Sequence, residues 1–458
     1  MSRSFCPECF EKQQRIDRLE EENQRLKQQL GYRQRQAEQG FFGSATPSSK
    51  VPLKLNAPED QRYKRGGAVA GHSGHGRRAV DQSNADRIEA VEVEPPCPHC
   101  GGPLQYKGWR NRTVFDSRPQ RTERILYRLQ KKFCPGCRRY VEARAPGVLP
   151  KALIGNQRLA QIVFWHYQHG IPLGRLSKQT QIGLGTLHQA LHRLAGVFRP
   201  ILPFLIEQYR HAPVRHADET SWRTDGHSGY AWLFASCSVS LFLFRSTRSA
   251  SVAKEILGES PLKGVLVVDR YNGYNRAPCA LQYCYAHLLR ELEDLDKEFP
   301  NPPEVRPFTS GLIPLLAQAM HLHSQILSDR QYARQARRLQ RQILALIQHP
   351  AQHLGIRRIQ DIFTENAHRL YHWVTDRQVP ADNNQAEREL RPTVIARKVS
   401  FGSQSDAGAK TREILMTVVH TLKKRVPDPE THFKNILDQL AAQPSQNPVT
   451  RLFPHDSS

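Results

Sequence analysis

The chain has 458 residues, a formal net charge of +23 and 39% hydrophobic residues. This length accommodates two to four domains, and the hydrophobic content is high enough to bury a core, which excludes global disorder. A positive surplus of this size favours a polyanionic partner, nucleic acid first, because each phosphate neutralised by a basic side chain releases counterions. A basic surface without such a partner is the alternative.

Neither a leader nor a membrane span is expected. The start MSRSFCPECFEKQQR lacks an apolar segment. The longest apolar stretch, residues 230–244, is shorter than the roughly 20 residues of a membrane helix and is typical of two strands. We therefore expect a cytoplasmic protein whose nine cysteines are mostly reduced and better suited to metal than to disulfides.

Residues 1–40 are expected to combine a Cys-x-x-Cys knuckle with a dimerisation helix. A heptad repeat begins at Ile16, and its a and d positions hold Ile16, Leu19, Asn23, Leu26 and Leu30. An Asn at an a position favours a parallel two-stranded coiled coil, whereas a lone charged helix is the alternative. In the dimer, Cys6 and Cys9 of both copies could share a zinc ion; otherwise they are spare surface thiols.

Residues 41–94 are rich in Gly, Ser, Pro and basic side chains, which predicts a flexible linker. Its KRGG and GHGRR segments could lie along a DNA minor groove, or they are part of a solvated tether.

Residues 95–148 are expected to form a zinc ribbon. Two Cys-x-x-Cys knuckles supply four thiolates, the usual ligands of tetrahedral structural zinc: Cys97, Cys100, Cys134 and Cys137. The segment between the knuckles alternates as strands do. A catalytic dithiol is the competing interpretation, although one pair would suffice for it.

Residues 150–205 predict helices separated by glycine-containing turns, the pattern of a helix-turn-helix DNA-binding domain. Four polar side chains would lie on its recognition helix: Thr186, His188, Gln189 and His192. A small packing bundle is the alternative.

Residues 206–300 predict the first part of a catalytic core. Three strands come first, with Asp218 on the first of them; a helix and a short apolar strand ending at Asp269 follow. This is the order of an RNase H-like α/β fold, in which the first and fourth strands are neighbours. Asp218 and Asp269 would then stand side by side, and a divalent cation such as Mg²⁺ would relieve their repulsion.

A third acid is expected from residues 376–425, the second part of the core. The stretch DNNQAERELRP can begin a helix near Asp382 or Asn383, with residues 382–384 as its cap and Glu387 one turn inside. Glu389 would point elsewhere and be solvated. An ordinary polar surface helix is the alternative.

These residues carry a resemblance to a known family. The segments ADETSW, VVDRYNGY, CYAHLLREL and DNNQAERELRPTVIARKVSFGSQSDAGA resemble DDE transposases of the insertion sequence 66 family. The resemblance extends to the N-terminal helix, the linker, the zinc knuckles and the tail. The Cys6 knuckle is not part of the family pattern. The overall expectation is a multidomain α+β protein: coiled coil, zinc ribbon, helix-turn-helix and an RNase H-like core with a helical insertion.

The resemblance implies a catalytic triad of Asp218, Asp269 and Glu387 holding two Mg²⁺ (or Mn²⁺) ions per active site. Such a site cleaves the 3′ ends of the element and transfers them to target DNA. Cys284 and His287 match a Cys-x-x-His pattern, which places His287 near the scissile phosphate, or else they are packed core residues. Downstream of Glu387, three basic residues are candidate phosphate contacts: Arg391, Arg397 and Lys398, with Arg397 or Lys398 favoured by the resemblance.

Residues 301–375 predict a helical insertion, and residues 426–458 a C-terminal helix and tail. The insertion contains the basic segment RRLQRQ, which suits contacts with a nucleic-acid backbone, although most charged helix faces are only solvated.

The expected partners are double-stranded DNA at the element ends and target, a second copy or more of the chain, and accessory proteins of the same element, in a bacterial, nucleoid-associated setting without a membrane. Two other classes stay open. One is a zinc and helix-turn-helix regulator without catalysis; the other is an RNase H-like nuclease or resolvase.

Overall fold

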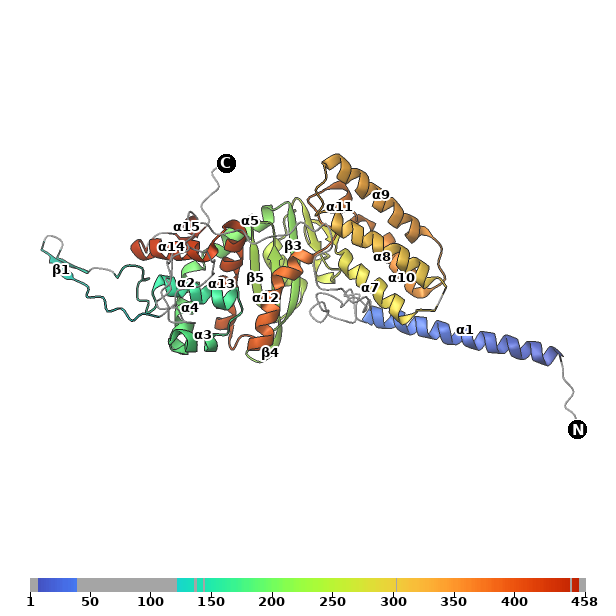
Figure 1. Ribbon diagram of the computed structural model, residues 1–458, viewed down its shortest axis with the longest axis horizontal. Coiled ribbons are helices and arrows are strands. Elements are labelled where there is room, and N and C mark those ends of the chain that lie inside the picture. The colour runs from blue at the N-terminus through green and yellow to red at the C-terminus, as the bar shows by residue number, and fades with distance from the viewer. Residues whose placement is uncertain are drawn as a thin grey trace, which may run out of the picture. The chain divides into compact units, whose positions relative to one another are not determined.

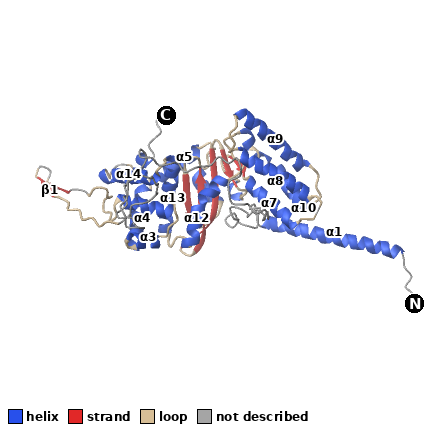
Figure 2. Cartoon of the chain, in the orientation of Figure 1, coloured by secondary structure: helices blue, strands red, loops and turns tan. Residues whose placement is uncertain are grey.

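The computed structural model describes residues 7–38, 122–135, 138–142, 145–301, 303–444 and 447–452. Its contacts divide the chain into two units, one of residues 1–51 and 124–458 and one of residues 52–123. The helices and strands below belong to the first unit (Figures 1 and 2). The linker predicted at 41–94 lies outside the described residues. No described helix has the length and apolar character needed to cross a membrane.

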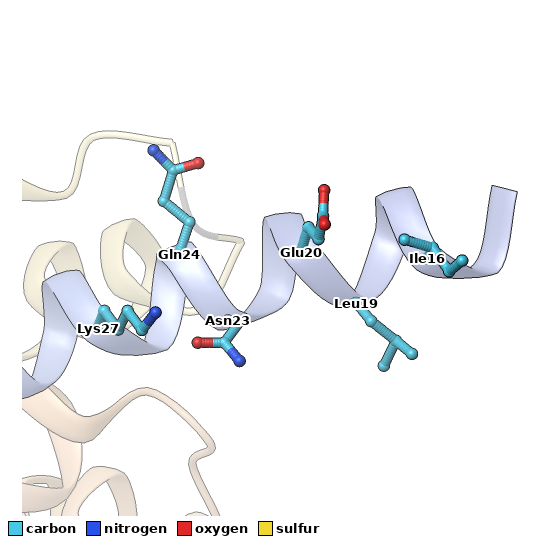
Figure 3. A pocket seen from close by; sticks show the side chains of 6 residues that line it. All are labelled: Ile16, Leu19, Glu20, Asn23, Gln24 and Lys27. Carbon is cyan, nitrogen blue, oxygen red and sulfur yellow. The ribbon is translucent and has the colours of Figure 1, made fainter. Parts of the chain in front are cut away.

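A long N-terminal helix, α1 (Pro7–Glu38), carries the predicted heptad repeat. Four of its a and d side chains are about half exposed: Ile16, Leu19, Leu26 and Leu30. Together with polar neighbours, Ile16, Leu19 and Asn23 line a shallow pocket of about 440 Å³. Figure 3 shows Leu19 and Asn23 on the side of the helix away from Glu20 and Gln24. The helix is present, and its pairing with a second copy stays a prediction.

The C-terminal half of α1 is attached to the rest of its unit. It packs against α10 (Leu354–Glu365). Gln29 is buried there, and its Oε1 accepts a hydrogen bond from the backbone N of Leu354 at 3.2 Å. The C-terminal half of α1 is therefore packed against α10, while its heptad side chains Leu26 and Leu30 stay about half exposed.

A small antiparallel sheet follows, made of β1 (Lys131–Cys134) and β2 (Arg139–Glu142). The alternating sequence before it predicts strand, but residues 122–130 have no regular secondary structure, and Ile125 and Leu126 are exposed. The strand prediction is wrong for these residues. Alternation yields a strand only where a partner strand and a buried face are available.

Four helices come next: α2 (Asn156–Tyr167), α3 (Leu173–Thr180), α4 (Leu184–Phe198) and α5 (Ile201–His211). Between α3 and α4 are three residues, and the left-handed conformation at Gln181 (φ 57°) ends α3. The turn contains glycine, as predicted, and Gly183 is the N-cap residue of α4.

The central sheet has five strands in the order β5-β4-β3-β6-β7: β3 (Val214–Thr224), β4 (His227–Ala235), β5 (Ser240–Arg245), β6 (Val265–Val268) and β7 (Ala280–Tyr283). The first three strands are antiparallel, and β6 runs parallel to β3. Val214 pairs with Val265, and His216 with Val267. The predicted adjacency of the first and fourth strands is confirmed.

Two layers of helices cover this sheet. On one face, Trp232 and Phe234 of β4 meet Tyr209 of α5 and Tyr274 of η2 (Asn272–Tyr274), which packs with α6 (Ala250–Leu257). On the other face lie α12 (Asn384–Ser400) and α13 (Asp406–Arg425), with Phe242 of β5 against His420 of α13. Figure 1 shows α12 crossing in front of the strands.

After β7 the chain forms a helical region from α7 (Tyr285–Glu298) through α8 (Val305–Leu322), α9 (Asp329–Gln348) and α10 to η3 (Ala367–Arg369) and α11 (His372–Thr375). Here α8 packs between α7 and α9. The chain then returns to the sheet through α12 and α13, and ends with α14 (Pro429–Ala442) and α15 (Pro448–Leu452). Because α13 packs on β5 and also on α2 and α4, it joins these helices to the sheet, and α14 adds a contact with α2.

Candidate active site

Neighbouring parallel strands carry Asp218 and Asp269 to the same edge of the sheet. His216 of β3 pairs with Val267 of β6. Asp218 lies two residues after His216, within β3, and Asp269 lies two residues after Val267, directly after β6. Equivalent positions on adjacent strands place side chains on the same face. The register, continued by two residues, would place the two carboxylates at matching positions, and the charge of Asp269 indeed raises the pKa of Asp218.

Helix α12 is attached to that same side of β3 at two points. At its start, the amide of Asn383 accepts a hydrogen bond from Nδ1 of His216 (2.9 Å) and donates one to the carbonyl oxygen of Ala217 (2.8 Å). Near its end, the guanidinium of Arg397 donates to Oγ1 of Thr220 (3.1 Å). The helix therefore runs along the strand in the strand's own direction.

The two attachment points bring Glu387 to Asp218. On β3, Asp218 lies between His216 and Thr220 and is on the same face as both. On α12, Glu387 lies between Asn383, which binds His216, and Arg397, which binds Thr220. Because side chains two residues apart on a strand share a face, Asp218 is on the face that α12 covers, and its carboxylate faces that of Glu387. This is how residues 169 positions apart in the sequence are placed together.

Mutual repulsion marks these acids as neighbours. Burial raises the pKa of Asp218 well above its usual range, and the negative charges of Glu219, Asp269 and Glu387 raise it further. Burial and the charge of Glu219 raise the pKa of Asp269 to about 7. The neighbouring negative charges thus destabilise the ionised forms of Asp218 and Asp269 unless cations are present.

Two arginines already neutralise the outer members of the group. Arg248 binds Glu219 through Nε at 2.9 Å, and the hydroxyl of Tyr274 also donates to that carboxylate. Arg290 of α7 binds Glu387 at 2.9 Å. The inner pair, Asp218 and Asp269, forms no ion pair with the rest of the described chain. Each accepts one backbone hydrogen bond, from Glu219 N and Tyr271 N respectively.

The inner pair fits a divalent cation by its chemistry. Carboxylate oxygens are the preferred ligands of Mg²⁺, and a cation stabilises the ionised form of two acids whose pKa values are raised. The charges of Arg248 and Arg270 offset only part of this rise at Asp269. In the described part of the chain, however, no three His, Cys, Asp or Glu side chains are grouped closely enough to hold a metal ion. Ligation by all three predicted acids stays a prediction, and Glu387 is paired with Arg290 instead.

Cys284 has a structural position. It is fully buried, and its Sγ accepts a hydrogen bond from the backbone N of Asn383 at 3.1 Å. Burial and the nearby charges of Glu387 and Asp382 raise the pKa of its thiol. The thiol is thus held in its neutral form at the start of α12, which agrees with the packed-core alternative for this residue.

His287, three residues on in α7, is partly exposed as a side chain, but its Nδ1 is buried and makes no hydrogen bond within the described chain. Burial, Arg290 and Arg270 lower its pKa to about 3. His287 is therefore neutral near neutral pH, and its role in catalysis stays a prediction.

The cap predicted for α12 is only partly correct. Asn383 is the N-cap residue, but its side chain makes no capping bond because it binds β3 instead. Asp382 instead accepts a hydrogen bond from the backbone N of Asn384, at the start of the helix, at 3.0 Å.

The prediction that Glu389 is merely solvated is wrong. It pairs with Lys424 of α13 at 2.8 Å and accepts from Oγ of Ser240 at 2.7 Å. A charged side chain on the sheet-facing side of a helix is buried with partners, a position that sequence spacing alone did not reveal.

The three basic candidates of α12 differ in surroundings. Arg397 bonds to Thr220 and Ser221 of β3, Lys398 is exposed, and Arg391 is partly exposed. Lys398 can therefore contact a phosphate without losing a hydrogen bond within the described chain. Arg397, by contrast, attaches α12 to β3.

The four predicted recognition residues of α4 differ in their surroundings. Thr186 and Gln189 line a largely apolar pocket of about 320 Å³ with residues from the chain before α2 and from the C-terminal segment. His188 and His192 are exposed, and Nδ1 of His192 lies 2.6 Å from Oγ1 of Thr411. A recognition face made of these four residues and its contact with DNA stay predictions.

Only part of the predicted zinc site falls within the described residues. Cys134 is the last residue of β1, in the hairpin that surrounds the second knuckle. Cys97, Cys100 and Cys137, like Cys6 of the N-terminal knuckle, lie outside the described residues.

Sequence reasoning missed Glu219, Arg248, Arg290 and His216 as members of the site. Glu219 directly follows Asp218 and the segment YNGY supplies Tyr274, so a signal existed in the quoted motifs. Arg290 and His216 become visible only when α7 and β3 are placed beside α12.

A mixed sheet that gathers acids from two adjacent strands and a later helix defines a candidate active site of the kind used in metal-dependent phosphoryl transfer. The family model described as "Transposase IS66 family" matches residues 151–411, more than half of the chain and the whole of this site. The chain belongs to the IS66 transposase family.

Two relatives from Sinorhizobium fredii (strain NBRC 101917 / NGR234) are similar over most of the chain. Uncharacterized protein y4hP is 24% identical over 429 residues, covering 82% of this chain and 76% of its own length. Uncharacterized protein y4qI is 24% identical over 418 residues, covering 81% and 76%.

Proposed function

We propose that this transposase binds the terminal inverted repeats of its element, cleaves their 3′ ends and joins them to target DNA, using Asp218, Asp269 and Glu387 as ligands of divalent metal. The observation that supports this proposal best is the pair Asp218 and Asp269: the pKa values of both are raised, and neither carboxylate forms an ion pair with a described residue. The strand order and the return of α12 to β3 support an RNase H-like core for this chemistry.

In the proposed reaction, water first attacks the phosphorus at the element end. The P–O3′ bond breaks, and the element is left with a 3′-hydroxyl. That hydroxyl then attacks a phosphorus of the target, forming the new P–O bond as the old one breaks, with no covalent enzyme intermediate. Bound Mg²⁺ or Mn²⁺, two per site, would activate the attacking oxygen and stabilise the leaving one. Asp218 and Asp269 would hold the ions on the sheet, and Glu387 would complete the ligand set from α12.

Other parts of the chain would deliver the DNA. The helices α2–α4 would bind the element ends through His188, His192 and neighbouring polar groups, and Lys398 and Arg391 would contact phosphates beside the site. Structural zinc at the two knuckles, dimerisation through α1 and accessory proteins of the same element belong to the same proposal. The exposed heptad side chains of α1 favour a second copy as its partner.

The test is incubation of the protein with its element-end DNA and Mg²⁺ or Mn²⁺, followed by mapping of 3′-hydroxyl ends and of joined products. Metal-dependent nicks at the ends together with strand transfer are expected. Nicks without joining would favour a nuclease, and binding without nicks would favour a regulator.

The Arg290–Glu387 ion pair predicts competition between arginine and metal. In the variant Arg290→Met, Glu387 no longer has to leave a charged partner, so we expect Mn²⁺ to bind about tenfold more tightly, since hydrogen bonds to charged groups contribute about 1.5–3 kcal/mol. Isothermal titration calorimetry of the folded chain without DNA measures this.

Lys297→Met, which removes a charge from an exposed position on the same helix, is the matched control. Equal Mn²⁺ affinity in the Arg290 and Lys297 variants would show that the ion pair does not restrain Glu387.

A further inference from the structure

Helix α9 carries an unusual concentration of arginine on its exposed side. Five arginines are exposed at intervals of three and four residues: Arg330, Arg334, Arg337, Arg338 and Arg341. This set is called the α9 arginine face below. The opposite side is buried and apolar or aromatic, with Tyr332, Ala336, Leu339, Ile343 and Ile347. Residues three or four apart are neighbours on a helix, so these arginines form one continuous strip.

The charge of this face is not neutralised by the described chain. Asp329 is the only acidic residue of α9, and it pairs with Arg377 of the following segment at 2.8 Å. No ion pair joins any of the five arginines to another described residue. Other helices of the protein pair their charges locally, as Lys434 does with Asp438 at 2.6 Å.

An unpaired strip of this kind has a cost. Like charges at i and i+4 destabilise a helix by roughly 0.2–0.5 kcal/mol per pair, and Arg330 with Arg334, Arg334 with Arg338 and Arg337 with Arg341 are such pairs. The helix is nevertheless well fixed, since Ser328 and Gln331 form a capping box at its start. A solvated helix face alternates charge signs more readily than it repeats one sign five times.

The dimensions suit a nucleic-acid backbone. From Arg330 to Arg341 the helix rises by roughly 16 Å, which equals about five base-pair steps along a duplex. Arginine is suited to phosphate because its planar guanidinium donates two parallel hydrogen bonds. No exposed aromatic side chain lies on this face to stack an unpaired base, since Tyr332 is buried; this favours a duplex over a single strand.

We propose that the α9 arginine face is a binding surface for the phosphate backbone of double-stranded DNA, separate from the helices α2–α4. The inference rests on the proposed function for the choice of DNA among polyanions. Because phosphate contacts carry no sequence information, this surface binds element ends and other duplexes alike.

The experiment compares the full chain with two variants of equal net charge. One combines Arg334→Gln, Arg337→Gln and Arg341→Gln; the other combines Lys297→Gln, Arg306→Gln and Arg357→Gln, all exposed positions of the same helical region. Binding of a fluorescein-labelled, mixed-sequence DNA duplex is followed by anisotropy without added divalent cations at several sodium chloride concentrations. Circular dichroism checks the helix content of each variant.

For the α9 variant we expect the slope of log affinity against log salt to become shallower by about 2–3, with binding at low salt weakened about tenfold or more. The control variant should keep the slope within about 1 of the unsubstituted chain. Replacing the same three arginines by lysine should restore most of the slope, because the charge returns.

Equal slopes in the two Gln variants would overturn this inference while leaving the proposed function intact. A loss seen with single-stranded RNA but not with the duplex would also overturn it. If the unsubstituted chain binds no duplex at all, the proposed function fails as well.

Discussion

The variants Asp218→Asn, Asp269→Asn and Glu387→Gln are each expected to lose strand cleavage by about 10³-fold or more, the scale seen when a central catalytic group is removed. Each change replaces a carboxylate with an amide of nearly the same shape, so the ligand charge is lost while the fold is kept. End binding should stay within about threefold, because phosphate and base contacts supply it and these carboxylates do not. Gel analysis of cleaved ends and a mobility-shift assay measure the two properties.

Asp225→Asn is the matched control. Asp225 is exposed in the turn between β3 and β4, with φ 51°, a conformation that Asn adopts readily. It removes one carboxylate from the same hairpin, so we expect unchanged cleavage. Cleavage at the unsubstituted rate by Asp218→Asn would refute the assignment of the site.

Asn383→Ala is expected to lower the free energy of unfolding by about 2–4 kcal/mol, because it leaves buried polar groups without partners. The lost contacts are those to His216 and to the carbonyl of Ala217, which join α12 to β3. Burial lowers the pKa of His216 to about 4, so this histidine is neutral and donates from Nδ1 near neutral pH. Cleavage should fall as well, since Glu387 is no longer held opposite Asp218. Urea unfolding followed by tryptophan fluorescence gives the free energy.

Asn384→Ala provides the comparison, because Asn384 begins α12 and its side chain does not bind β3. We expect this change to alter the unfolding free energy by less than about 0.5 kcal/mol. If both alanine variants unfold alike, Asn383 does not attach the helix to the strand.

Much of the sheet could be predicted from the sequence. The alternating segment from Val214 to Thr224, the apolar run before Asp269 and the intervening strands and helix are present where their patterns indicated them. Their order implied that the first and fourth strands are neighbours, which the register of β3 and β6 confirms. Strand periodicity and short connections carry this information locally.

The predictions that failed concern contacts between segments that are distant in the sequence. Glu389 looked solvated because its partners, Lys424 and Ser240, come from α13 and β5. Asn383 looked like a cap because Asn is favoured there, but a buried strand competed for its amide. The pairing of Arg290 with Glu387 also needs α7 and α12 to be placed in space. Local sequence preferences contain none of these pairings.

Whether Asp218 holds a divalent cation is tested most directly by exchanging its carboxylate for a thiolate. In Asp218→Cys we expect no cleavage of element-end DNA in Mg²⁺, and measurable cleavage in Mn²⁺, because a softer ligand binds Mn²⁺ better than Mg²⁺. Asp218→Ala should be inactive in both ions. Cleavage by Asp218→Cys that is the same in Mg²⁺ as in Mn²⁺, or cleavage by Asp218→Ala, would contradict the proposed site.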